Sequence, residues 1–274
     1  MTMKIGIIGC GVIGGGFATH FSKHHSLVLF DIDKDRCKSL AKDFSGDVHI
    51  AENLEDVVSG TDLSLLAVKP QSLDEVTQIL APHIHKGHLL VSTLAGVSLQ
   101  KLQRRFCSAS ILRIMPNVAC FHGQGVIGLV ENSQLSTEAK NMTDELFSGL
   151  GITLWIPEKN VDAVTALSGS GPAFLFVIIE AMVDAGISMG LTPTIAKDLV
   201  LQTIQGAVTM SVETGMHPGE LKWQVSSPSG TTIAGLQEME KMSVRAGIIE
   251  TIMAAFRRAK ELGNERVFGK VSDV

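Results

Sequence analysis

The chain has 274 residues, 45% of them hydrophobic and 19% charged, so it can build one large domain or two modest ones with an ample core. The formal net charge is −5 and no dense cluster of Lys and Arg occurs, which excludes nucleic acid as the main partner. The four cysteines lie far apart with no C-x-x-C pair, so neither a zinc knuckle nor a redox dithiol is indicated. The lack of tyrosine excludes every mechanism that uses a phenol as proton donor.

The first predicted element is a short apolar strand over Lys4 to Ile8, followed by three glycines in G-x-G-x-x-G spacing and a helix-compatible stretch. In this pattern Gly9 makes the tight turn, Gly11 lets the backbone approach a pyrophosphate, and Gly14 lets the helix pack on its strand. The phosphates would lie on the N-terminal amides of the helix. The sequence therefore predicts a dinucleotide site, whose first contacts are Gly9, Cys10, Gly11, Val12, Ile13 and Gly14.

A second apolar strand, Leu27 to Asp31, ends in a carboxylate that can accept hydrogen bonds from both ribose hydroxyls. Because such a carboxylate would repel a 2′-phosphate, the expected cofactor is NADH or NADPH with a preference for NADH. Two alternatives remain open. Lys34 and Arg36 could receive a phosphate if the loop turned them inward, and Asp31 could be an ordinary turn residue.

The first half of the chain alternates strands and helices, which predicts an α/β Rossmann-like doubly wound parallel sheet over residues 1–157. The strand ends should converge on the cofactor. Further expected strands are Leu63 to Ala67, Leu89 to Ser92, Ile111 to Met115, Gly125 to Leu129 and Thr153 to Ile156. Expected cofactor contacts at their ends are Ala67, Val68, Lys69, Pro70, Ala95, Gly96, Met115, Pro116 and Asn117.

Two of these strand ends have structural alternatives. Ala67 to Pro70 could be a strand end closed by an X-Pro pair, although its backbone and Lys69 could also reach phosphates or ribose. Arg113 to Asn117 could be a rigid turn, although Asn117 could offer its amide to a nicotinamide or a substrate.

Residues 158–274 show no strand pattern and predict an all-helical domain. Its apolar residues cover more than one helix face, so we expect this domain to pack against a second subunit. The longest uncharged stretch, Ala163 to Ile179, is interrupted by Gly and Pro and predicts a buried helix, with no membrane partner. The expected helices are Val161 to Met189, Pro193 to Glu213, Pro218 to Val225, Thr231 to Met242 and Ser243 to Leu262.

Within the helical half, the run from Val225 to Thr232 places a Ser/Gly/Thr loop before a helix. The amides of Gly230, Thr231 and Thr232 and the positive end of the helix suit a small carboxylate. The alternative is an elaborate N-cap in which Ser229 or Thr231 supplies the capping oxygen.

No residue spacing indicates a metal site, and His83, His85 and His88, which cluster near a turn, are expected at the surface. The glycine fingerprint begins within the first ten residues, which leaves no space for a signal peptide and predicts a cytoplasmic location.

Taken together, these segments resemble the pyrroline-5-carboxylate reductase family over nearly the whole chain. The shared segments are IGIIGCGVIG, AVKPQ, RIMPN, DAVTALSGSGPAF, ETGMHPGELK and SSPSGTTIAGLQEME. The glycine fingerprint is common to many dehydrogenases, whereas SGSGPAF and SPSGTT in this order are far more specific.

The resemblance implies hydride transfer from a reduced nicotinamide to the C=N carbon of 1-pyrroline-5-carboxylate, which gives L-proline. It implies that the amides of Gly230 and Thr231 hold the carboxylate and that Thr232 meets the ring nitrogen as the catalytic residue. It also places Glu158, Val225 and Ser227 near the substrate and Asn53 near the adenosine. It further implies a homodimer through interlocked helical domains, which can assemble into a ring.

Four departures from the family pattern bear on the substrate. Val118-Ala119 replaces Thr-Pro, Ser229 replaces a glycine, Trp223 replaces an acidic residue and Phe174 replaces a tyrosine. None removes a group assigned to hydride transfer. Two other hypotheses therefore stay open, a reductase of another cyclic imine and a noncatalytic dinucleotide-binding protein.

Overall fold

The computed structural model describes residues 2–264, which form two compact units. Among the described residues, the sheet unit comprises 2–170 and 255–264, and the helical unit comprises Gly171–Ala254. This division differs from the expected one after residue 157. The last ten residues of the expected 158–274 domain lie outside the described part of the chain.

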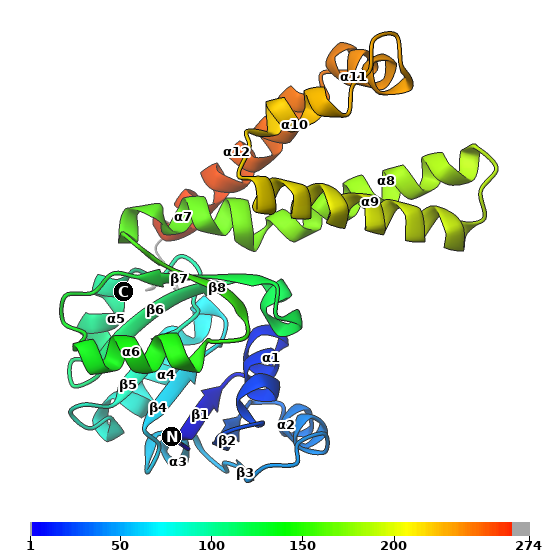
Figure 1. Cartoon of the computed structure of the whole chain (residues 1–274). Helices are drawn as coiled ribbons and strands as arrows, with labels where there is room; N and C mark the ends of the chain where they lie inside the picture. Colours follow the sequence, from blue (N-terminus) through cyan, green and yellow to red (C-terminus); the bar gives the residue numbers. More distant parts are fainter. Residues whose placement is uncertain (1, 265–274) are drawn as a thin grey trace, which may run out of the picture. The chain divides into compact units, whose positions relative to one another are not determined.

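The sheet unit is built on an eight-stranded sheet with the order β3-β2-β1-β4-β5-β6-β7-β8 (Figure 1). All neighbouring strands are parallel except β6 and β7, so the prediction of a wholly parallel sheet is wrong at that pair. The short connection from β6 to β7 explains the reversal, because a parallel pair needs a long crossover. The strands are β1 (Lys4–Ile8), β2 (Ser26–Phe30), β3 (Val48–Ile50), β4 (Leu63–Leu66), β5 (Leu89–Ser92), β6 (Ser110–Pro116), β7 (Gly125–Val130) and β8 (Gly151–Ile156).

Helices cover both faces of this sheet, as the doubly wound prediction requires (Figure 1). One apolar cluster packs α1 (Val12–Phe21), α2 (Lys34–Ala41) and α6 (Thr137–Leu146) against the sheet. A second cluster packs α3 (Leu54–Val58), α4 (Leu73–Leu80) and α5 (Leu99–Arg105) on the opposite face. The seven predicted strands are confirmed with boundary shifts, whereas β3 was missed because three residues carry too little periodicity. Short 3-10 turns lie at η1 (Pro70–Ser72), η2 (Ala81–His83), η3 (Val118–His122) and η4 (Glu158–Asn160).

The register of the central strands aligns the residues that follow them. Ile8 at the end of β1 pairs with Phe30 of β2 on one side and with Leu66 of β4 on the other. The glycine turn, Asp31 and Ala67 therefore leave the sheet at one edge.

The residues directly after β8 belong to the sheet unit. Val161 and Val164 of α7 (Val161–Val164) pack with Met115 of β6 and Val130 of β7 in a small apolar cluster. A π-helical turn, η5 (Thr165–Gly169), then precedes α8 and interrupts the helix expected from Val161 to Met189. The boundary therefore lies after Ser170 because residues up to that point contribute to the packing on β6 and β7.

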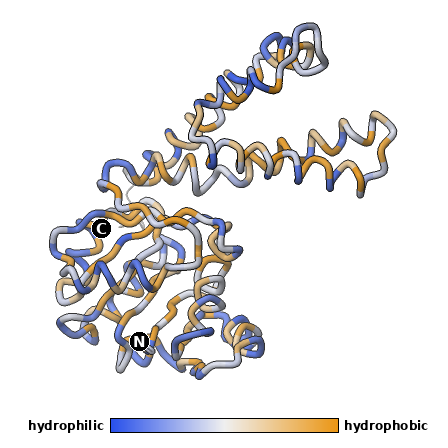
Figure 2. The backbone as a smooth tube through the Cα atoms, in the orientation of Figure 1, coloured by the Kyte–Doolittle hydropathy of each residue, from blue (hydrophilic) through white to orange (hydrophobic). Residues whose placement is uncertain are grey.

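The helices of the helical unit bury few apolar side chains against one another. Apolar residues recur all along α8 (Figure 2). Phe176 and Val177 of this helix are more than 60% exposed. The expectation of a buried helix is thus wrong for the single chain, since only 6% of the most apolar window within Glu158–Ser188 is buried. That stretch is also long and apolar enough to cross a membrane by length and composition alone. The helices are α8 (Gly171–Ser188), α9 (Pro193–Thr214), α10 (Pro218–Gln224), α11 (Thr231–Lys241) and α12 (Val244–Asn264), which ends in the sheet unit.

Candidate active site

The glycine turn between β1 and α1 is shaped as a phosphate cradle. Gly9 has φ +93°, and a Cβ there would lie 2.7 Å from the Ala67 carbonyl oxygen. A Cβ on Gly14 would lie 1.8 Å from the Gly9 oxygen, whereas a Cβ on Gly11 would meet nothing within 4 Å. Gly11 is the N-cap of α1 and offers no side-chain cap, so the first amides of the helix are left for another acceptor. The open space over Gly11 and these amides fit the pyrophosphate of a dinucleotide.

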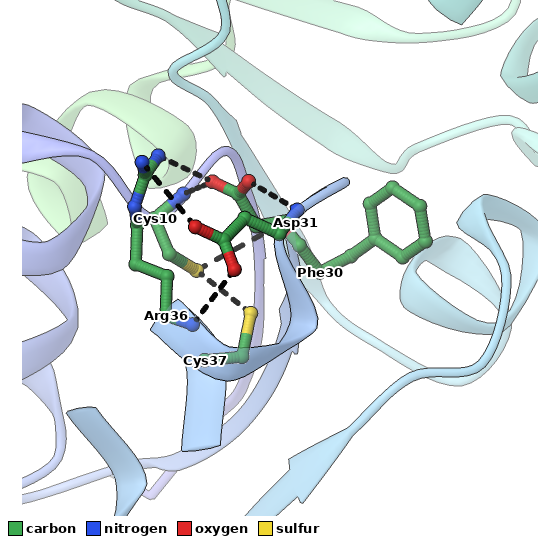
Figure 3. A network of polar contacts seen from close by, with 6 residues as sticks. Cys10, Phe30, Asp31, Arg36 and Cys37 are labelled. Carbon is green, nitrogen blue, oxygen red and sulfur yellow. Dashed lines mark hydrogen bonds and ion pairs between the residues drawn. The ribbon is translucent and has the colours of Figure 1, made fainter. Parts of the chain in front are cut away.

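Asp31 follows β2 and ties the glycine turn to the next loop (Figure 3). Its Oδ2 accepts a hydrogen bond from the Cys10 amide at 2.7 Å, and its Oδ1 accepts one from the Asp33 amide at 2.9 Å. Only 8% of the residue is exposed. The carboxylate thus serves the loop itself, in addition to any ribose hydroxyl it accepts.

Two cysteines that are 27 residues apart in sequence meet beneath this loop. The Sγ atoms of Cys10 and Cys37 lie 3.6 Å apart, and both residues are buried (Figure 3). Burial is the main cause that raises the pKa of each thiol above its ordinary value. Both thiols therefore remain protonated at neutral pH and pack as small apolar groups.

Most of the other expected cofactor residues lie at the same edge, after β4, β5 and β6, which follow β1 in that order across the sheet. Ala67, Val68, Lys69 and Pro70 join β4 to η1, and Lys69 is exposed. Ala95 and Gly96 follow β5, and a Cβ on Gly96 would lie 2.9 Å from the Leu262 oxygen of α12. Met115 and Pro116 end β6 and precede Asn117. Val12 and Ile13 open α1.

Two residues that were expected to contact the cofactor, Asn53 and Asn117, use their side chains in hydrogen bonds within the protein. Asn53 caps α3, with its side chain accepting from the Asp56 amide at 2.9 Å. Asn117 is 8% exposed, and its Nδ2 donates to the carbonyl and the hydroxyl of Ser168 at 3.2 and 3.1 Å. Its Oδ1 accepts from the Val126 amide at 3.2 Å. The side-chain amide that was expected to meet the nicotinamide is therefore engaged in holding η5 on β6 and β7.

Glu158 lies in the sheet unit, where it forms an ion pair with Arg113 of β6. Glu158 Oε1 also accepts from the Leu99 amide, the first residue of α5, at 3.0 Å. The Arg113 side chain is 6% exposed, and its Nε and the Glu158 Oε2 are buried without a hydrogen-bond partner. Sequence reasoning missed this pair, although an arginine inside the apolar run of a strand signals a buried counter-ion. The pair joins β6, the start of α5 and η4.

The Ser/Thr loop of the helical unit precedes α11. Gly230 is the N-cap and provides no side-chain cap, so the capping oxygen considered for Ser229 or Thr231 is not used. Ser229 has φ +59°, a left-handed conformation that is costly for a residue with a Cβ. Thr231 and Thr232 form the first turn of α11, with free amides at the positive end of an 11-residue helix.

The remaining residues expected near the substrate also lie on this loop. Val225 is 56% exposed at the end of α10, and Gly230 donates its amide to the Ser227 carbonyl at 3.1 Å. A Cβ on Gly230 would lie 2.2 Å from the Ser227 hydroxyl, so the loop requires glycine there.

Two known families match separate parts of the chain. Residues 158–262 match a model described as pyrroline-5-carboxylate reductase dimerisation, and residues 4–96 match one described as NADP oxidoreductase, coenzyme F420-dependent. A pyrroline-5-carboxylate reductase of Synechocystis is 37% identical over 97% of this chain and the whole of that protein. One of Methanosarcina acetivorans is 36% identical over 96% of this chain and 98% of that protein.

The chain belongs to the pyrroline-5-carboxylate reductase family. A crystal structure of the Streptococcus pyogenes enzyme, 31% identical, has a TM-score of 0.84 and covers 95% of this chain and 99% of that one. The Plasmodium falciparum reductase with NADP bound, 29% identical, has a TM-score of 0.83 over 95% of this chain and 98% of that one. The resemblance found in the sequence and the expected fold class are therefore confirmed. The sheet unit of this reductase family member carries the NADP oxidoreductase match, and most of the dimerisation match falls on its helical unit.

Proposed function

We propose that this chain catalyses the NAD(P)H-dependent reduction of 1-pyrroline-5-carboxylate to L-proline, the last step of proline biosynthesis. One observation carries the proposal. In a member of this family, two helices begin at glycine N-caps without a side-chain cap, α1 at Gly11 and α11 at Gly230. Each helix start leaves backbone amides that can bind an anion. The cofactor has a pyrophosphate and the substrate has a carboxylate.

Gly9 to Gly14, Asp31 and the loops after β4, β5 and β6 would hold the cofactor. When bound, the cofactor would supply a hydride to the C=N carbon of the substrate. The Thr231 amide holds the substrate carboxylate together with the Gly230 amide, which leaves the Ser227 carbonyl to make this contact, and the Thr232 hydroxyl orients the ring nitrogen. Because a protonated imine is already electrophilic, these residues accelerate the reaction by orientation and need no strong base.

The helical unit forms the homodimer. The exposed apolar side chains of α8 and α9, among them Phe176, Val177 and Leu199, would be covered by a second copy. We assign the apolar stretch Glu158–Ser188 to contact with the second subunit and not to a lipid bilayer. The dimer can assemble further into a ring, and we place the enzyme in the cytoplasm.

The proposal is tested by following the absorbance of NADH and NADPH with 1-pyrroline-5-carboxylate and with six-membered cyclic imines. We expect turnover with 1-pyrroline-5-carboxylate. Preference for a six-membered imine would favour the alternative that Ser229 and Trp223 suggest. Cofactor binding without turnover of any imine would instead indicate the noncatalytic alternative.

Variants of the two loops separate chemistry from cofactor binding. Thr232→Ala should lower kcat/KM by about tenfold to a hundredfold through one lost hydrogen bond to a charged group, with unchanged dinucleotide binding, and Thr232→Ser should restore most of it. Gly11→Ala should weaken dinucleotide binding and leave the turnover of bound substrate unchanged. The added Cβ has space in the folded chain, but it occupies the position of the cofactor phosphate. Full activity of Thr232→Ala would remove the role assigned to that hydroxyl.

A further inference from the structure

Arg36 lies over the two carboxylates at the end of β2 (Figure 3). Its Nη1 is 3.4 Å from Asp31 Oδ2, and its Nη2 is 3.6 Å from Asp33 Oδ2. Both distances exceed those of a tight charge-assisted hydrogen bond. The Arg36 side chain is 49% exposed, so these pairs are screened by solvent and contribute little stability. The guanidinium can therefore leave them at low cost.

Asp31, in contrast, is fixed in place. Its two oxygens already accept the amides of Cys10 and Asp33, and the residue is nearly buried. A 2′-phosphate arriving at this position would face a carboxylate that cannot turn away. The site can accept that phosphate only if a nearby cation offsets the repulsion.

Two other cations near this edge form ion pairs with other carboxylates. Lys34 forms an ion pair with Glu52, and Lys38 pairs with Asp35 at 3.1 Å. Arg36 alone among these three lies against Asp31. Its planar guanidinium also matches two phosphate oxygens at once, which an ammonium does not.

We propose that Arg36 determines the dinucleotide specificity of this chain by moving from Asp31 and Asp33 onto the 2′-phosphate of NADPH. With NADH, Arg36 stays on the two carboxylates and Asp31 accepts the ribose hydroxyls. The chain therefore binds both cofactors, and the preference for NADH expected from Asp31 is reduced or reversed. This inference rests on the dinucleotide site of the proposed function, but not on the identity of the imine.

The test uses isothermal titration of the full-length protein with adenosine 2′,5′-bisphosphate and with 5′-AMP, which differ only in the 2′-phosphate. Arg36→Ala should weaken binding of the bisphosphate by about tenfold to a hundredfold, the loss of a charge-assisted contact, and change AMP binding by less than about twofold. Arg36→Lys should retain part of the bisphosphate affinity. Lys38→Ala is the matched control from the same helix and should change neither.

Fluorescence titrations with NADH and NADPH repeat the comparison with whole cofactors. An equal loss for both ligands in Arg36→Ala, or no loss for either, would overturn the inference. If the selective loss occurs in a protein that reduces no imine, the inference stands and the proposed reaction fails. If the unaltered protein binds neither adenine nucleotide nor either cofactor, both fail.

Discussion

The sheet unit buries its apolar side chains within itself, whereas the helical unit leaves most of its apolar side chains exposed. In the sheet unit, two clusters of buried residues fill both faces of the sheet, and its buried polar residues include Asp31 and Asn117, whose side chains accept hydrogen bonds from backbone amides. In the helical unit, only a few residues of α8, α9 and α10, such as Ala196 and Val200, are buried. The sheet unit therefore has a core of its own, whereas the helical unit needs a partner surface to bury its side chains.

The largest effect is expected where the helical unit meets that partner. Phe176→Glu should weaken self-association by about a thousandfold or more, since two-fold symmetry places two unpaired carboxylates in one apolar interface. Phe176→Leu should keep the dimer. Sedimentation velocity at micromolar concentration checks this, and a Phe176→Glu protein that still sediments as a dimer contradicts the contrast drawn between the units.

The next effect concerns the Arg113–Glu158 ion pair of the sheet unit, in which the arginine is buried and the glutamate is partly exposed. Glu158→Gln should lower the free energy of unfolding by about 2 to 4 kcal/mol, because it leaves the Arg113 guanidinium buried without a counter-charge. Urea titration measures the loss, with the exposed Glu138→Gln as control. A normal stability combined with a raised KM for the imine would assign Glu158 to the substrate, as the family resemblance implies, and not to the support of β6.

A smaller effect comes from His88, which is fully buried with its Nε2 3.0 Å from the Ser64 hydroxyl. Burial, with the positive charge of His85, lowers the pKa of His88 to about 4 from its ordinary 6.5. Between pH 6.5 and 4 the His88 imidazole therefore binds a proton in the unfolded chain but not in the folded chain. The free energy of unfolding falls as the pH drops through this range. The loss attributable to His88 is about 2 to 3 kcal/mol.

Urea titrations between pH 4 and 7 check this slope. His88→Gln should flatten it, whereas the exposed His85→Gln should have little effect. His20 and His25, whose pKa values burial also lowers, contribute to the slope that remains. An unchanged slope in His88→Gln would show that the imidazole is protonated in the folded protein.

The smallest effect is expected in the loop before α11. Ser229→Gly should stabilise the protein by about 0.5 to 1 kcal/mol, because φ +59° costs less without a Cβ, although glycine also loses more chain entropy. Ser243→Gly, at φ +55° between α11 and α12, is the matched control for stability. A change in KM for the imine in Ser229→Gly alone would connect this departure from the family pattern to substrate choice.

Much of the fold was predictable because its signals are local. Gly9, Gly11 and Gly14 reveal themselves by spacing, and runs of β-branched and apolar residues between turns locate seven of the eight strands. The three-residue β3, the antiparallel orientation of β7 and the π-helical turn at Thr165–Gly169 were missed. Each depends on packing between segments and leaves no periodicity in its own residues.

The sequence by itself determined the dinucleotide turn, the division into a sheet-rich and a helical half, and the family. Only the tertiary structure decided that Cys10 contacts Cys37, that Arg36 covers Asp31, that Arg113 pairs with Glu158 and that His88 is buried. A turn is dictated by the backbone conformations that neighbouring residues allow, so it can be read from adjacent letters. An ion pair or a buried imidazole depends on which surfaces the folded sheet brings together, and residues that are distant in sequence carry no mark of that meeting.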